Sequence, residues 1–74
     1  MKKADLKTLG NNIRAERNRL KYTQEDIEQR TGILAQHIGR IEKGEVDVRF
    51  STLILILEAL NITFDKIYKL NIKK

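Results

Sequence analysis

The sequence contains no cysteine, no proline and no tryptophan. Without cysteine the chain can form neither a disulfide nor a thiolate metal site, which suits a reducing cytoplasm. Histidine occurs once, at His37, so a histidine-based metal cluster cannot form within one chain. No apolar run approaches the roughly 20 residues of a membrane span, and the start MKKADLKTLG lacks the apolar stretch of a secretion signal. These absences predict a cytoplasmic protein with no metal, no cofactor and no membrane contact.

Patterns typical of enzymes are absent as well. The sequence has no glycine-rich phosphate loop, no Ser/His/Asp set and no cysteine nucleophile. Glu42 and Glu45 are close in sequence, but nothing predicts a pocket around them. With 74 residues the chain is one small domain that would struggle to build a buried active site. We therefore expect a single domain over residues 1–74, with an ordered core at about 6–70, that is not an enzyme.

Positive charge is the clearest feature of the composition. Fifteen Lys and Arg residues face ten Asp and Glu residues, which gives a net charge of +5 and a sequence pI near 9.8. Such a balance suits a polyanionic partner such as DNA, although charge alone is weak evidence for one.

Two short helices with a tight connection are predicted in the middle of the chain. Thr23 can cap the first, and Asp26 three residues later completes a variant of the capping box. Gly32 ends this helix, because glycine tolerates the left-handed conformation found at many helix ends. A second helix follows at about 35–43. Since about three residues cannot turn the chain antiparallel, we predict a helix-turn-helix at about 24–43.

The second of these helices has two chemically different faces. At 100° per residue, Gln36, Arg40 and Lys43 fall within about 60° of one another. Ile38 and Ile41 point the opposite way. The polar face offers an amide, a guanidinium and an ammonium, which suit adenine edges, guanine edges and phosphates. A plain solvated face is the alternative, but the capped helix before it and the basic charge favour a recognition helix.

Hydrophobic spacing outside this motif predicts three more helices, at about 6–21, 50–60 and 64–70. Asp47 and Thr63 are expected to cap the last two. The residues expected to point inward are Leu6, Leu9, Ile13, Leu20, Phe50, Leu53, Ile56, Leu57, Leu60, Phe64, Ile67 and either Tyr68 or Leu70. The fold class predicted is all-α, with five helices and no strand.

Two charges fall on apolar stripes and are therefore expected to meet. Arg17 lies between Ile13 and Leu20 on the first helix, and Glu42 lies on the inward side of the recognition helix. A charge in such a place needs a partner, and these two have opposite signs. We infer a structural Arg17–Glu42 salt bridge, costly to break although it adds little net stability.

The residues R-x-x-x-x-x-TQEDI, TG, IGRIEKG and F-x-x-L-x-x-I-x-x-x-L-x-I, in this order, resemble the phage-repressor and Cro-type helix-turn-helix family, also called XRE-type. The resemblance covers about residues 9 to 68, and its several motifs agree together. It implies a compact five-helix lambda-repressor-like domain. The implied function is a sequence-specific DNA-binding transcriptional regulator, most consistent with a repressor that binds a palindromic operator on double-stranded DNA as a homodimer.

The resemblance also implies roles for single residues. Gln24 would hydrogen-bond a phosphate at the start of the first motif helix. Lys43 and the loop after Gly44 would lie along the DNA backbone. The residues implied to face base edges in the major groove are Ala35, Gln36, His37 and Arg40. Arg17 and Glu42 match a charged pair of the family, in agreement with the pairing inferred from the stripes.

Several positions depart from the family pattern: Val48 and Arg49 replace a common Pro-Ser helix start, and three more departures lie in the motif itself. Glu28 stands where alanine is usual, so it either leans outward or weakens the contact between the motif helices. Leu34 replaces the usual Ser or Thr cap of the recognition helix, at a cost of about 1 kcal/mol, and could instead touch a thymine methyl group. Gly39 costs roughly another 1 kcal/mol in mid-helix, offset if it lets the helix approach the groove closely. Together these departures argue against very tight DNA binding.

The run from Leu53 to Leu57 is apolar all round, which is unusual for a surface helix. Ile54 and Leu55 are therefore expected to be exposed and to form a homodimer interface, with Leu70 as a further candidate. The alternative is that a tail containing Leu70 and Ile72 folds back over them. A dimer would need its recognition helices about 34 Å apart. The same surface supports a second functional hypothesis, a protein-interaction module such as an antitoxin, with DNA binding secondary.

Overall fold

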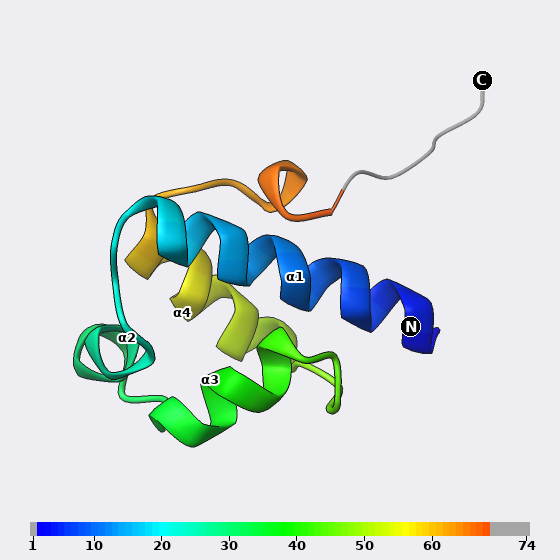
Figure 1. The fold of residues 1–74 in the computed structure, drawn as a ribbon, viewed down its shortest axis with the longest axis horizontal. Coiled ribbons are helices and arrows are strands. Elements are labelled where there is room, and N and C mark those ends of the chain that lie inside the picture. The colour runs from blue at the N-terminus through cyan, green and yellow to red at the C-terminus, as the bar shows by residue number, and fades with distance from the viewer. Residues whose placement is uncertain (1, 69–74) are drawn as a thin grey trace.

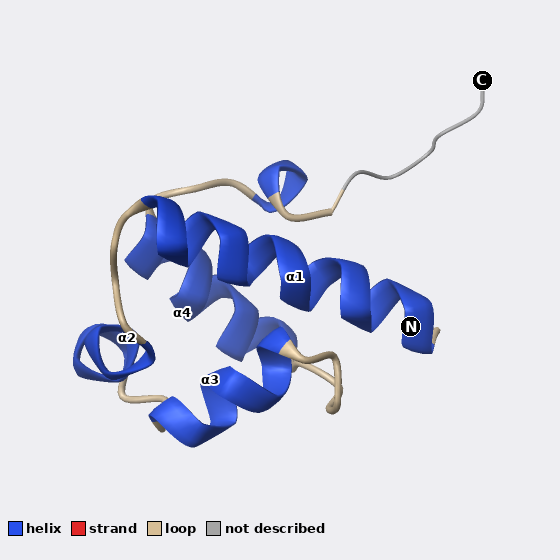
Figure 2. Ribbon diagram, in the orientation of Figure 1, coloured by secondary structure: helices blue, strands red, loops and turns tan. Residues whose placement is uncertain are grey.

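The computed structural model describes residues 2–68, and within them the chain forms four α-helices, one short 3₁₀ segment and no strand (Figures 1 and 2). The elements are α1 (Lys3–Arg19), α2 (Gln24–Thr31), α3 (Ala35–Glu42), α4 (Phe50–Leu60) and η1 (Phe64–Lys66). The all-α prediction and the positions of the two motif helices are confirmed.

The apolar sides of the helices meet in one core. α3 packs on α1 and on α2, and α2 also packs on α4. Figure 1 looks almost down the axis of α2 while α3 runs across the view, so the two motif helices cross steeply. The buried core residues are Leu9, Ile13, Ile27, Ile38, Ile41, Leu53, Ile56, Leu57, Leu60 and Ile67.

The predicted fifth helix is wrong. In the part of the predicted range that the structure describes, residues 64–68, only Phe64–Lys66 is helical, and it is 3₁₀. The Asn12 side-chain amide donates to the Ile67 carbonyl at 2.7 Å, which ties this segment to α1. The Tyr68 hydroxyl donates to Asp5 Oδ1 at 2.9 Å, a bond that raises the pKa of Tyr68. Leu70 and Ile72 lie outside the described residues.

Two other boundaries differ from the predictions. α1 begins at Lys3, earlier than expected. The N-cap residue of α4 is Arg49 rather than Asp47, and Phe50 is 74% exposed instead of pointing inward. Val46 and Val48 in the preceding loop pack against the core instead.

α1 and the end of α3 approach each other through their backbones. A Cβ atom built on Gly10 would lie 2.3 Å from the Ile41 carbonyl oxygen and 2.6 Å from that of Glu42. No side chain larger than hydrogen fits at this distance without movement of one helix. Gly10 therefore sets how close the two helices pack.

Candidate DNA-binding surface

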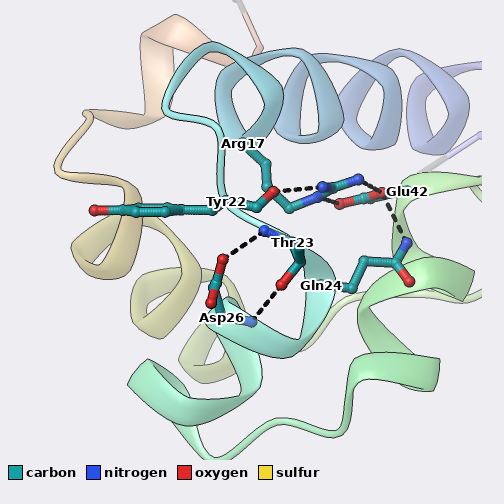
Figure 3. Close-up of polar contacts among 6 residues, drawn as sticks. All are labelled: Arg17, Tyr22, Thr23, Gln24, Asp26 and Glu42. Atoms are coloured by element: carbon teal, nitrogen blue, oxygen red, sulfur yellow. Dashed lines mark hydrogen bonds and ion pairs between the residues drawn. The ribbon is translucent and has the colours of Figure 1, made fainter.

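The start of α2 is closed by the predicted capping box (Figure 3). Thr23 Oγ1 accepts from the Asp26 backbone N–H at 3.0 Å, and Asp26 Oδ2 accepts from the Thr23 N–H at 2.8 Å. The backbone hydrogen bond from Thr23 holds the pKa of Asp26 below its ordinary value of 3.8. Gly32 ends the helix at φ 79°, in the left-handed region. The helix is thus fixed at both ends.

The recognition helix α3 is capped by a residue of α2. Its N-cap position is held by Leu34, whose side chain has no acceptor. Glu28 instead accepts from the Ala35 backbone N–H, with 2.7 Å between Oε1 and N. The sequence predicted that Glu28 either leans outward or weakens the contact between the motif helices. Both predictions are wrong, because its carboxylate hydrogen-bonds α3 and so joins the two helices. This bond satisfies one of the free N–H groups at the start of α3, as a polar N-cap side chain would do for a neighbouring N–H.

The predicted ion pair between Arg17 and Glu42 is present (Figure 3). Arg17 Nε donates to Glu42 Oε2 at 2.6 Å and its NH2 group donates to Oε1 at 3.0 Å. The remaining NH1 group donates to the Tyr22 carbonyl at 2.7 Å. The side chains are 12% and 3% exposed, and the hydrogen bond with Glu42 raises the pKa of Arg17. This fork fixes the C-terminal end of α3 on α1.

Gln24 joins the same network from the start of α2 (Figure 3). Its Nε2 donates to Glu42 Oε1 at 3.1 Å, which uses one of the two N–H groups of the amide. A Cβ on Gly39 would lie 3.2 Å from this Nε2. Gly39 is buried, and its missing side chain makes room for Gln24; that it also lets the helix approach the groove stays a prediction.

The outer side of α3 is open to solvent. A hollow of about 470 Å³ is lined by Ile33, Leu34, Gln36, His37 and Arg40. It brings together three of the residues predicted to read bases. Arg40 Nε lies 4.0 Å from Glu45 Oε1, and both side chains are about half exposed, so solvent screens this contact and the guanidinium is held only weakly.

Lys43 lies apart from that hollow, in a second one shared with Lys3 and Lys7 of α1. Sequence reasoning assigned no role to these two lysines. Periodicity within α1 could not reveal them, since their proximity to Lys43 depends on how α1 packs against the end of α3. Glu45 lines the same hollow, but the three lysines outnumber this one carboxylate, so the hollow suits a phosphate backbone. Within residues 2–68 no helix is long and apolar enough to cross a bilayer.

Comparison with known proteins agrees with this geometry. Residues 13–67 match the sequence model of the helix-turn-helix family. The chain is 36% identical to control protein C.SmaI of Serratia marcescens over 59 residues. This stretch covers 80% of this chain and 70% of C.SmaI. The fold of this chain is similar to that of the restriction-modification controller protein C.AhdI from Aeromonas hydrophila in its crystal structure, with a TM-score of 0.83. The two are 25% identical, and the match covers 88% of this chain and 98% of C.AhdI. The chain belongs to the XRE-type helix-turn-helix family of DNA-binding transcription regulators.

Proposed function

We propose that this protein controls the transcription of restriction–modification genes, acting as a homodimeric repressor on a palindromic operator. The names of its relatives, a control protein and a restriction-modification controller, supply the biological setting. The observation that carries the proposal is the outer side of α3, where exposed Gln36 and Arg40 line one hollow. Both ends of that helix are held from inside by Glu28 and Glu42.

Base reading is assigned to the outer side of α3. Arg40 would pair with a guanine edge and Gln36 with an adenine edge, the bidentate contacts that these groups make in a major groove. Ala35 and His37 border the same surface and would lie against neighbouring base edges.

Phosphate contacts are assigned to the ends of the helices. The second amide N–H of Gln24 remains for a phosphate at the N-terminus of α2. Lys43, with Lys3 and Lys7 beside it, would follow the DNA backbone at the other end of α3. Such contacts give affinity and orientation without sequence preference.

The first experiment is selection of bound duplexes from a random pool, followed by titration at several salt concentrations. We expect one enriched palindrome and a slope of about −0.9 in log K against log salt for each phosphate contacted. A promoter containing that palindrome should be transcribed less when the protein is added. A slope without enrichment would reject sequence-specific control, and increased transcription would reject repression.

Substitution of Arg40 or Gln36 by alanine is expected to weaken binding to the enriched site by about 1–3 kcal/mol and to relax base preference. Gln24→Ala should instead weaken binding to all sequences alike. Lys66→Ala is the matched control for loss of one charge, because η1 lies on the side of α1 away from α3 (Figure 1). Equal losses for Arg40→Ala on the enriched site and on random DNA would refute its role in base reading.

The homodimer is assigned to the outer side of α4. Phe50, Ile54 and Leu55 are 74%, 38% and 42% exposed, an apolar surface of the kind that marks an interface. Ile54 also borders a hollow with Phe64. Leu70, the other interface candidate from sequence, lies outside the described residues. This surface would place the same helix of each subunit against its symmetry mate.

Leu55→Lys is expected to shift the protein from dimer to monomer, because it would bury a charge within the proposed contact. Sedimentation velocity without DNA at several concentrations measures the shift. Leu34→Lys is the matched control, since Leu34 is also exposed, at 65%, but lies just before α3, as its N-cap residue. A monomeric wild type that copurifies with another protein would favour the interaction-module hypothesis, and a dimer that survives Leu55→Lys would place the interface elsewhere.

A further inference from the structure

Leu34 is an apolar residue in a polar surrounding. It is 65% exposed and lines the hollow on the outer side of α3 together with Gln36, His37 and Arg40. An exposed leucine adds nothing to the core and gains no hydrogen bond. Next to it Ile33 is half-buried and packs against the core, so an apolar wall continues from the interior to the rim of this hollow.

The start of α3 does not depend on the Leu34 side chain. N-cap positions favour Ser, Thr, Asp or Asn, because their oxygen accepts from a free N–H in the first helical turn. Here Glu28 reaches across from α2 and accepts from Ala35 at 2.7 Å. Because Glu28 on another helix makes this hydrogen bond, the residue at position 34 does not need a polar side chain. Its side chain can serve a contact outside the protein.

We propose that Leu34 reads the C5-methyl group of a thymine in the major groove. The inference rests on the proposed operator binding and names one base feature that the site recognises. Residues at the N-terminal end of a recognition helix are those that contact base edges. Among the four bases only thymine presents a methyl group in the major groove, and apolar side chains are its partners there.

The residues around Leu34 suit a surface that contacts both polar groups and methyl groups of bases. Gln36 and Arg40 offer donors to adenine and guanine, while Leu34 and Ile33 offer the only aliphatic lining of the same hollow. Burying one methyl group is worth about fourfold in Kd, equal to about 0.8 kcal/mol. Leu34 therefore adds selectivity for a thymine that hydrogen bonds alone would not supply.

The test uses the enriched duplex, with each thymine replaced in turn by deoxyuridine, which lacks only the C5-methyl group. For the wild type, we expect replacement at one thymine of each half-site to weaken binding about fourfold. For Leu34→Ala the same replacement should change Kd by less than about 1.5-fold. Gln36→Ala is the matched control from the same hollow, and it should keep the full deoxyuridine effect.

The outcomes separate this inference from the proposed function. Specific binding that is insensitive to deoxyuridine at every thymine would overturn the methyl contact and leave operator binding intact. An equal effect of deoxyuridine on wild type and Leu34→Ala would assign the methyl group to another residue and overturn the inference. Absence of any sequence preference would overturn both. Because Leu34 is exposed, Leu34→Ala should keep the thermal midpoint of the wild type, which circular dichroism verifies.

Discussion

Replacing Glu42 by alanine is expected to lower the free energy of unfolding by about 3 kcal/mol. The carboxylate is 3% exposed and accepts from two nitrogens of Arg17 and from Gln24. Its removal leaves a guanidinium that is 12% exposed without its charged partner, and an unpaired buried charge costs more than the pair contributes. Urea denaturation followed by circular dichroism measures the change.

Two comparisons make this result specific. Glu16→Ala breaks the Glu16–Arg19 pair, in which Arg19 is 58% exposed, and should cost less than about 0.5 kcal/mol. The double variant Arg17→Met, Glu42→Leu removes both charges and should recover most of the loss, because apolar residues of similar volume can replace a buried pair. A loss below about 1 kcal/mol for Glu42→Ala would show that solvent already compensates Arg17.

Gly10→Ala is expected to destabilise the fold by about 2 kcal/mol and to lower the thermal midpoint by roughly 10 °C. The added methyl would lie 2.3 Å from a backbone carbonyl oxygen of Ile41, and a backbone cannot rotate away as a side chain can. This overpacking outweighs the gain of about 1 kcal/mol that alanine brings to a helix interior.

Gly39→Ala is the matched substitution in the other helix. Its new methyl would meet the end of the Gln24 side chain at 3.2 Å, and this flexible end can shift by a few tenths of an ångström. We expect a change within about 1 kcal/mol in either direction, since the gain in helix propensity opposes the displacement of Gln24. Equal losses at the two glycines would contradict the importance of the α1–α3 backbone contact.

Local patterns predicted much of this structure correctly. The capping box at Thr23 and the helix end at Gly32 each depend on residues close in sequence, and both are present. The Arg17–Glu42 pair was also predictable, although 25 residues separate its members. Each charge stood alone on an apolar stripe, so burial demanded a partner.

The errors arose where contacts depend on how helices are placed. The bond from Ala35 to Glu28 exists only because the steep crossing of α2 and α3 brings this carboxylate to the end of the next helix. Asn12 on α1 donates a hydrogen bond to the carbonyl of Ile67, which lies more than 50 residues later in the sequence. Periodicity describes which side of a helix is buried, but it contains no information about such tertiary partners.

The attachment of α3 has a consequence for how operators and regulators change together. Within residues 2–68, α3 is held by the bond from Ala35 to Glu28, by the bonds of Glu42 with Arg17 and Gln24, and by the inward isoleucines Ile38 and Ile41. The outward side chains from Leu34 to Arg40 contribute little to that attachment. If the outward residues read bases as proposed, DNA recognition and folding depend on separate positions of one short helix. A new operator preference can arise by exchange of a few outward residues while the scaffold keeps its stability, so related regulators can diverge to non-overlapping DNA sites without interfering with each other.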